Sequence, residues 1–444
     1  MMRKEMTTFE TDFSRYGILD DSVPADIALE EMLSDETIRV VHAYTPLNFT
    51  KRHHIKRSNI TFDFHGNRVT AIGIEHANHN DPFSALFHIT GERLNEIRSV
   101  SLSHPLQELY DIFEVDDSDQ FELDSWWIVT CNALSGREEK EIDKMVQVTE
   151  IIDKTHVRFN YKMGWPLETG RVLTYQKVKP IVDVSVNNMR FCGNREGEET
   201  GVEPIAYEYA VNCNVSNIHA KFTYWPVILR RHNTGYVTER CSLHNPIEVV
   251  VGGTGYLTQQ IHCLYGKVRD CEASNARHLN DFTGSAYCMV ENCHGDGDFH
   301  GAFVTHGQFE HDLTYIGNSG LLSFANSGPT WGSSAKRITV IRHVGCWGLA
   351  FAKVSDLTLQ DVVIQKTEKY EECGSLLLNA DGLQVRGCMA ERLVLTQRSN
   401  RSKRPVAIEN SYFTEGVEIT TTGEAAVKAK IRMINTIDKD GKEC

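Results

Sequence analysis

A short phrase of the form Val-x-x-Cys occurs twice in this chain, 22 residues apart, at Val268–Cys271 and Val290–Cys293. Small, polar and histidine-rich sequence follows each phrase, where a helix would show apolar residues three and four apart. A period of about two dozen residues built from short strands is typical of a stacked β-solenoid. Residues one period apart then lie one above the other, at the roughly 4.8 Å spacing of neighbouring strands. The spacing therefore places Cys293 over Cys271 and His300 over His278.

An apolar marker of the same kind continues through the second half of the chain at intervals of 19 to 31 residues. Its positions are Val237, Val268, Val290, Leu313, Val340, Leu359, Val385 and Ile408. Asparagine follows several of these strands, and it suits turns and left-handed backbone. The asparagines concerned are Asn188, Asn217, Asn292 and Asn410. We predict first coils over residues 46–100 and a main parallel stack over 181–416.

Three segments depart from this rhythm. The segment SVPADIALEEMLSDE predicts a helix within residues 1–45, which would cap the first coil and cover its open strand edges. Residues 101–180 carry more charge and short alternating strands such as SWWIVTC, which favour an inserted small β subdomain. Residues 417–444 are expected to form terminal strands or an oligomerisation segment.

The composition excludes several classes of protein. A hydrophobic content of 41% and a charged content of 24% are those of a globular chain, and no run approaches the ~20 apolar residues of a membrane span. No apolar segment follows the start MMRKEMTTFETDFSRYG, so we expect synthesis in the cytoplasm without a signal peptide. The net charge of −14 argues against a nucleic-acid partner. The twelve cysteines form no CxxC pair and are expected to be small buried hydrophobes.

The helix, the phrase SNITFDFHGN at 58–67, the β insertion and the run from Asn280 to Val340 together resemble a known family. They are similar to the pectate-lyase-like β-helix of phage appendage proteins, and more narrowly to pre-neck appendage or tail-spike proteins of phages and prophages of Gram-positive bacilli. The resemblance is most specific over residues 260–345. It implies an all-β, right-handed parallel β-helix in the virion tail, commonly a homotrimer, beside other tail proteins. It also implies recognition, and often cleavage, of a host cell-surface polymer such as teichoic acid or another wall glycan.

Acidic and histidine side chains gather in the same stretch of the chain. Hydrolysis of a glycosidic or phosphodiester bond needs one group to protonate the leaving oxygen and another to activate water. Stacked coils can bring carboxylates from successive coils close enough for this chemistry. The candidate catalytic residues are Asp281, Asp296, Asp298, His300 and Glu310. Asp-Gly pairs are also common in plain turns, which is the alternative interpretation of Asp296 and Asp298.

Other polar residues of this stretch are candidates for substrate binding. Amides and imidazoles can bond sugar or phosphate oxygens, an aromatic ring can stack on a sugar face, and an arginine can pair with an anionic group. The candidates are His278, His306, His311, Asp312, Asn318, Asn326, Trp331 and Arg337. An asparagine ladder and a buried tryptophan are the structural alternative.

A metal ion is a separate hypothesis. His300, His306 and His311 with Asp296 or Asp298 could bind a divalent cation, although no HExxH signature is present. Loops rich in Asp and Asn make Ca²⁺ equally suitable. No cofactor is required for simple hydrolysis. The favoured function is therefore a phage spike that binds and hydrolyses a wall polymer. A non-catalytic adsorption spike and a polysaccharide lyase of pectate type remain as alternatives.

Overall fold

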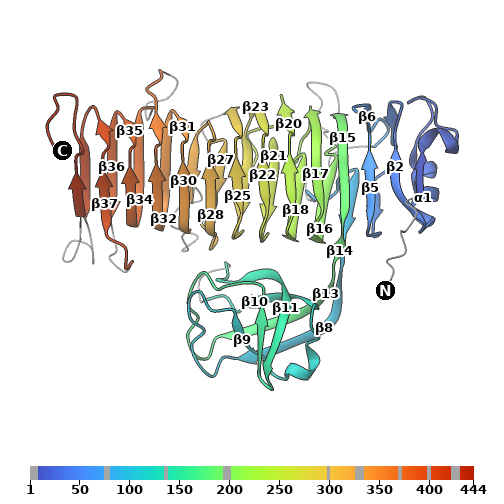
Figure 1. Ribbon diagram of the computed structural model, residues 1–444. Coiled ribbons are helices and arrows are strands. Elements are labelled where there is room, and N and C mark those ends of the chain that lie inside the picture. The colour runs from blue at the N-terminus through green and yellow to red at the C-terminus, as the bar shows by residue number, and fades with distance from the viewer. Residues whose placement is uncertain are drawn as a thin grey trace, which may run out of the picture.

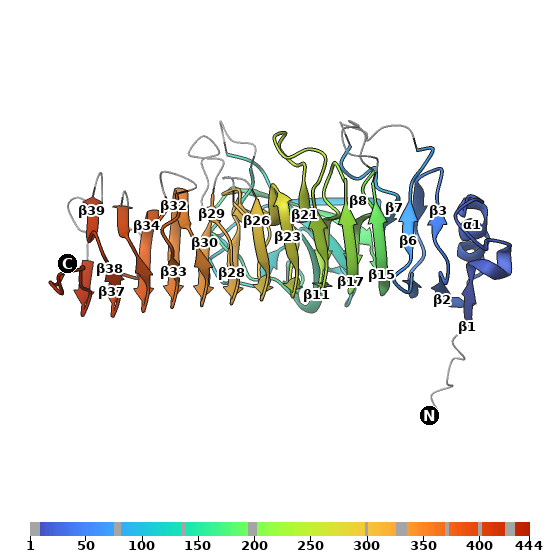
Figure 2. The same cartoon turned by 90° about the horizontal axis from the view of Figure 1, so that it is seen from above.

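In the computed structural model, short strands stack in parallel along one axis and form a long parallel β-helix (Figure 1). The structure describes residues 9–74, 81–134, 139–193, 202–297, 301–325, 335–368, 373–397, 402–421 and 431–444. The single α-helix in this part of the chain lies at one end of the stack and the C-terminus at the other (Figure 2). The fold confirms the predicted all-β parallel β-helix with an N-terminal helix and an inserted antiparallel sheet.

The first of three parallel sheets runs the length of the stack, each strand pairing with the next. Its strands are β4 (His53–Ile55), β7 (Phe87–Thr90), β16 (Ile205–Val211), β18 (Ile228–Thr234), β21 (Tyr256–Ile261), β24 (His278–Thr283), β27 (Phe303–Thr305), β29 (Leu322–Phe324), β32 (Trp347–Gln360), β34 (Ser375–Arg386), β36 (Arg392–Gln397) and β39 (Val417–Thr421). The two-residue β14 (Ile181–Val182) pairs with the end of β16.

The second sheet contains most of the predicted repeat. Its strands are β1 (Phe9–Asp12), β2 (Ile38–His42), β5 (Ile60–Asp63), β15 (Val184–Cys192), β17 (Asn214–Lys221), β19 (Val237–Glu239), β22 (Lys267–Arg269), β25 (Met289–Glu291), β28 (His311–Ile316), β30 (Lys336–Ile341), β37 (Val406–Glu409) and β40 (Ile431–Ile434). The second halves of β32 and β34 complete it.

The third sheet is made of shorter strands. They are β3 (Leu47–Asn48), β6 (Arg68–Thr70), β20 (Ser242–His244), β23 (Glu272–Ala276), β26 (His294–Gly297), β31 (Val344–Gly345), β33 (Val363–Ile364), β35 (Met389–Ala390) and β38 (Tyr412–Phe413). The ends of β15 and β17 belong to it as well. Leucine, isoleucine, valine and phenylalanine side chains from all three sheets point inward and form one continuous core.

The register tests the repeat marker directly. Val268 pairs with Val290, as the 22-residue spacing predicts, and the backbone N–H of His294 bonds the carbonyl of Cys271, which sets Cys293 over Cys271. The same column continues through Val340, Leu359, Val385 and Ile408. Two of the proposed positions were wrong.

The residues that occupy this column in place of Val237 and Leu313 are Thr238 and Tyr315. Both are fully buried, so the inward position in these coils is held by a hydroxyl-bearing side chain that an aliphatic marker misses. The predicted stacking of His300 over His278 falls on a residue outside the described ones. In the neighbouring pair, Asn280 lies beside Phe303, a spacing of 23.

The asparagines after the strands form the corner between the second and third sheets. Asn188, Asn217, Asn292 and Asn410 have φ values of 57°, 54°, 50° and 50°, the left-handed conformation predicted for them. The side-chain amide of Asn217 also donates to Asn188 in the coil below, at 2.8 Å. The corner therefore turns sharply in each coil without a glycine.

The helix α1 (Asp26–Ser34) closes the N-terminal end, preceded by the 3₁₀ turn η1 (Phe13–Tyr16). It buries Ala28, Leu29 and Met32 against the first coils. The buried carboxylate of Asp26 accepts hydrogen bonds from the Thr50 backbone and from His53 Nε2, at 3.0 and 2.9 Å. This helix covers the apolar end of the stack, as a solenoid cap must.

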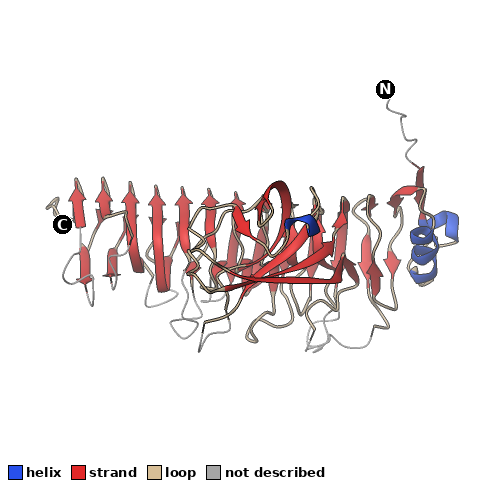
Figure 3. Cartoon of the chain, turned by 90° about the horizontal axis from the view of Figure 1, so that it is seen from below, coloured by secondary structure: helices blue, strands red, loops and turns tan. Residues whose placement is uncertain are grey.

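Between β7 and β14 the chain leaves the stack and forms a six-stranded antiparallel sheet (Figure 3). Its strands are β8 (Glu92–Ser101), β9 (Ile112–Glu114), β10 (Trp126–Cys131), β11 (Asp143–Asp153), β12 (His156–Phe159) and β13 (Val172–Lys179), with the 3₁₀ turn η2 (Ser118–Gln120). Trp127, Phe159 and Tyr175 are buried in its own core, which also includes Leu264 and Ala286 of the stack. We call this unit the inserted sheet.

A buried arginine gives a test of the solenoid interior. The guanidinium of Arg230 lies between the rings of Tyr207 and Tyr236, 4.7 and 4.4 Å from their centroids, and donates to the Cys213 carbonyl at 3.0 Å. Arg230→Ala should lower the free energy of unfolding by about 3 kcal/mol or more, because it leaves a cavity and removes both ring contacts. Urea denaturation measures the loss.

Arg231→Ala is the matched control, since Arg231 follows on the same strand but points outward and pairs with Glu208 with 39% of its side chain exposed. Its expected loss is below about 1 kcal/mol. Equal losses in the two variants would contradict the interior role of Arg230.

All twelve cysteines are free thiols, nine of them buried. Within the described residues there is no helix of the length and apolarity that crossing a membrane requires.

Candidate functional site

The structure separates the predicted site residues into several places. Asp298, His300, Asn326 and Trp331 lie outside the described residues. The others lie on different strands and turns of the coils between β24 and β30, and each has its own set of partners. Whether any of them acts on a substrate stays a prediction, but their contacts show what each can do.

Asp281 and His306 form a buried ion pair on the first sheet. Asp281 Oδ2 lies 2.8 Å from His306 Nε2, and the two side chains are 0% and 18% exposed. Burial alone would lower the pKa of His306, but the charge and hydrogen bond of Asp281 outweigh it and raise this pKa. The pKa of Asp281 is lowered, because His306 more than offsets the effect of burial. This pair could move a proton, provided that a substrate reaches it.

Glu310 is fully buried and holds a turn. Its two carboxylate oxygens accept hydrogen bonds from the backbone N–H groups of Gly284, His306 and Gln308 at 3.0, 3.3 and 2.9 Å. Burial raises its pKa. Three backbone donors give the carboxylate a structural duty, so this geometry does not favour the predicted catalytic role.

Three further predicted residues have local partners. His278 is buried and hydrogen-bonded to the Gly301 carbonyl, and burial lowers its pKa to about 4. Asn318 bridges two coils, donating to the Val290 carbonyl at 3.0 Å and accepting from the Cys293 backbone at 2.8 Å. Asp296 is exposed on β26 of the third sheet, where it accepts a hydrogen bond from the Asn275 backbone at 2.9 Å. Asn318 is thus the ladder residue that the structural alternative describes.

His311 lies beneath the inserted sheet. Its Nδ1 is 2.7 Å from Asp312 Oδ2, and its Nε2 is 2.8 Å from the hydroxyl of Tyr161. A neutral ring that donates from Nδ1 to Asp312 and accepts at Nε2 satisfies both contacts. Burial lowers its pKa to about 4. Since the nitrogens of His306 and His311 are already engaged, a cation bound there would have to replace these bonds, and the cation stays a prediction.

Asp312 and Arg337 form the polar centre of this region. Arg337 donates to both oxygens of Asp312, from Nε at 2.8 Å and from a terminal nitrogen at 2.7 Å, and it also pairs with Glu108 of the inserted sheet. Burial would raise the pKa of Asp312, but His311 and Arg337 outweigh it and lower this pKa to about 2. The carboxylate is therefore ionised throughout the pH range in which proteins work.

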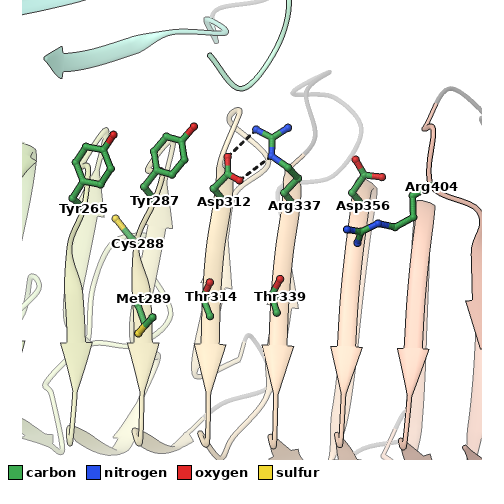
Figure 4. A pocket seen from close by; sticks show the side chains of 10 residues that line it. All are labelled: Tyr265, Tyr287, Cys288, Met289, Asp312, Thr314, Arg337, Thr339, Asp356 and Arg404. Atoms are coloured by element: carbon green, nitrogen blue, oxygen red, sulfur yellow. Dashed lines mark hydrogen bonds and ion pairs between the residues drawn. The ribbon is translucent and has the colours of Figure 1, made fainter. Parts of the chain in front are cut away.

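A pocket of about 430 Å³ opens around this ion pair (Figure 4). Its lining residues are Tyr265, Tyr287, Cys288, Met289, Asp312, Thr314, Arg337, Thr339, Asp356 and Arg404. Figure 4 shows the two tyrosine rings side by side at one end, the Asp312–Arg337 pair in the middle, and Asp356 with Arg404 at the other end. We call this pocket the polar groove.

The five side chains along the groove come from five successive coils. Tyr265, Tyr287, Asp312, Arg337 and Asp356 all have left-handed backbone, with φ between 53° and 58°. They occupy the same corner, just before the strands of the second sheet, and therefore stack one coil apart. Since neighbouring strands are about 4.8 Å apart, the backbones of Asp312 and Asp356 are separated by roughly 10 Å.

Aromatic and charged groups in the groove are held in place by their surroundings. The rings of Tyr265 and Tyr287 are stacked, with centroids 5.3 Å apart and an angle of 18° between planes. Their hydroxyls donate to the carbonyls of Asn160 and Lys162 in the inserted sheet. Asp356 accepts from Ser402, and Arg404 donates to Thr358 at 2.8 Å.

The inserted sheet thus forms one wall of the region. Lys336 bonds Glu108 at 3.0 Å and the Gly164 carbonyl at 3.1 Å. Gly164 has no room for a side chain, since a Cβ there would lie 2.4 Å from the His311 ring. Sequence reasoning found Asp312 and Arg337 but missed Tyr265, Tyr287, Asp356, Arg404 and Glu108. The two tyrosines are 22 residues apart, so the repeat spacing could have revealed them.

No protein-family model matches the sequence, and no curated protein matches it significantly. Solved structures do resemble the fold. The gp54 tailspike of Acinetobacter baumannii bacteriophage AP22, in complex with capsular saccharide, has a TM-score of 0.60 at 14% identity over 96% of this chain and 72% of its own. The tailspike gp61 of Pseudomonas phage phi297 has a TM-score of 0.61 at 13% identity over 94% and 75%. The tailspike gp49 of Pseudomonas phage LKA1 gives 0.60 at 13% over 93% and 72%. The chain therefore shares the β-helix fold of phage tailspikes.

Proposed function

We propose that this chain is the spike of a phage virion that binds a host cell-wall polymer along the polar groove and hydrolyses it. The observation that carries the proposal is the row of two stacked tyrosines, an Asp–Arg pair and a second Asp–Arg set on consecutive coils. The fold shared with tailspikes, one of them solved with a capsular saccharide, supports a saccharide as the ligand class. Teichoic acid or another wall glycan of Gram-positive bacilli is the substrate we propose, and the homotrimer and the pre-neck appendage are the proposed assembly and location.

Binding would use the chemistry at the two ends of the groove. The exposed faces of Tyr265, which is 41% exposed, and of Tyr287 offer apolar platforms for sugar rings. Arg337 and Arg404 offer donors to phosphate or carboxylate groups of the polymer. Threonines on the floor of the groove, Thr314 and Thr339, offer hydroxyls. Such a mixture of rings and hydrogen-bonding groups suits a glycan that carries anionic groups.

Hydrolysis would use the two aspartates. Asp312, with its low pKa, is ionised and would orient the attacking water and stabilise positive charge in the transition state. Asp356, which is partly exposed and has the Ser402 hydroxyl as a partner, would protonate the leaving oxygen. Inverting glycosidases place their two carboxyl groups about 6.5–9.5 Å apart, and residues two coils apart can meet that range with a small tilt of their side chains.

A specific observation favours a second function, adhesion without cleavage. Arg337 engages both oxygens of Asp312, which weakens this carboxylate as a base. A groove that only holds the polymer would use the pair as a rigid hydrogen-bonding unit. The alternative of a pectate-type lyase would yield unsaturated products.

The experiment is incubation of the purified protein with Gram-positive cell walls, with and without EDTA, followed by mass spectrometry of the soluble fraction. Saturated sugar or glycerol phosphate fragments are expected. Fragments that absorb in the ultraviolet would indicate a lyase. Protein that sediments with the walls but releases nothing would contradict hydrolysis and leave adhesion, while loss of release with EDTA would establish a required metal.

A further inference from the structure

A group of metal-ligating side chains lies at the opposite end of the stack from the polar groove's arginines, near the helix α1. Among the described residues, one atom each of His42, Asp63 and His65 lie within 4.8 Å of one another. His42 and Asp63 are register partners on β2 and β5, and His65 follows two residues later in the corner with φ of 50°. Successive coils therefore bring three ligand types to one point.

The contacts of His42 resemble those of a metal-bound imidazole. Its Nδ1 faces His65 Nε2 at 2.8 Å, and its Nε2 faces Glu10 Oε2 at 3.3 Å. A ligand histidine that donates its other N–H to a carboxylate is the common arrangement around zinc, because the carboxylate fixes the ring and increases its basicity. Glu10 stands in the position of that carboxylate.

Asp63 is oriented before any ion arrives. Its Oδ1 accepts hydrogen bonds from the His65 backbone N–H and from the side-chain amide of Asn188, both at 2.9 Å. The ring of Tyr44 stacks on both histidines, with centroids 5.4 Å from His42 and 4.6 Å from His65. The ring covers the outer side of the cluster and limits the movement of both imidazoles.

We propose that His42, Asp63 and His65 bind one Zn²⁺ ion, with water as the fourth ligand. Two imidazoles and one carboxylate are ligands that zinc prefers, whereas Ca²⁺ and Mg²⁺ prefer oxygen alone. In tetrahedral geometry, Zn–N bonds of 2.0–2.1 Å place two nitrogens about 3.3 Å apart, so the histidines need to separate by only about half an ångström. The ion replaces the proton that the two rings now share.

The ion would join the first coils of the stack. His42 lies on β2 and Asp63 with His65 on and after β5, while Glu10 belongs to β1, the outermost strand of the second sheet at this end. A ligand that binds only the folded chain stabilises it. The site is therefore structural, and it is independent of the function proposed for the polar groove.

A second pair of histidines in the chain provides a matched control. His54 and His88 contact each other through their Nδ1 atoms at 3.1 Å, and His88 Nε2 lies 2.8 Å from Glu208. Here the carboxylate is also paired with Arg231, so its charge is neutralised. This second group has the same residue types but offers no free anionic ligand, and it should not bind Zn²⁺.

The test is titration of the EDTA-treated and desalted protein with ZnCl₂ at pH 7.5, by calorimetry, and with CoCl₂ by visible absorption. We expect one equivalent to bind at micromolar concentration and to raise the melting temperature by about 2 °C or more. His65→Gln and Asp63→Asn should each weaken binding at least about 10-fold, and His88→Gln should leave it unchanged. Circular dichroism and melting in EDTA verify that each variant folds.

Absence of saturable binding at micromolar Zn²⁺, equal binding in His65→Gln, or loss of binding in His88→Gln would overturn the proposal. If His65→Gln and Asp63→Asn do not fold, Glu10→Gln decides the matter. Its exposed side chain contacts His42 without being a ligand, so it should fold normally and bind Zn²⁺ about 10-fold more weakly.

Discussion

Asp356→Asn is expected to lower the rate of fragment release from cell walls about 100-fold or more, because general acids contribute this much to bond cleavage. Asparagine has the size of aspartate, tolerates the left-handed backbone at this corner and can still bond Ser402, so binding should remain. The measurement is the initial rate of release, by mass spectrometry, together with the fraction of protein that sediments with the walls.

Asp361→Asn provides the matched control. Asp361 lies on the next corner of the same coil, also with left-handed backbone at φ 53°, and it is not among the residues that line the groove. Its replacement should leave the rate of release unchanged. Equal activity of Asp356→Asn and the parent protein would remove Asp356 from the mechanism, and equal losses in both variants would point to a general effect on the fold.

The stability of the protein is expected to fall steeply as the pH drops from 6.5 to about 4. Three fully buried histidines, His278, His311 and His343, have their pKa lowered to about 4, chiefly by burial. In the unfolded chain they take up protons near pH 6.5, whereas in the folded chain they stay neutral until about pH 4. Their stabilising contribution is complete above pH 6.5 and is lost as the pH falls.

The expected slope is about 1.4 kcal/mol per pH unit for each histidine, and the total loss is on the order of 3 kcal/mol for each. Urea denaturation at a series of pH values measures it. In His343→Gln, the slope should decrease by one proton, since the amide can donate to the Gly320 carbonyl, which the ring contacts at 2.7 Å, but cannot titrate. The exposed His294 serves as control, and His294→Gln should keep the full slope. A stability that does not change over this range would contradict the neutral burial of these rings.

Much of the fold follows from short-range patterns that the sequence displays. The spacing of Val268 and Val290 is the coil itself, and asparagines such as Asn217 mark the corner because few other side chains accept its left-handed backbone. The helix α1 was predictable from its apolar spacing. Thr238 and Tyr315 could not be found by an aliphatic marker, because the interior of these coils also accepts a hydroxyl beside Arg230 and a buried aromatic ring.

The site was predictable only where it lies within the repeat. Asp312 and Arg337 were identified among the polar residues of one stretch, but their position in a groove depends on coil register. Glu108 could not be linked to them, because it lies 228 residues before Lys336 and reaches it only through the packing of the inserted sheet. The same packing buries His311, which from its sequence neighbours looks like an exposed ligand. Contacts between remote elements carry no local pattern.

The central claim is that the polar groove holds a wall polymer. The most direct measurement is a crystal structure of the protein soaked with soluble fragments of Gram-positive cell walls. The account predicts sugar rings over Tyr265 and Tyr287 and an anionic group beside Arg337. Fragments bound instead in the pocket of about 250 Å³ lined by His219, Asp270 and His294, with the polar groove unoccupied, would contradict it.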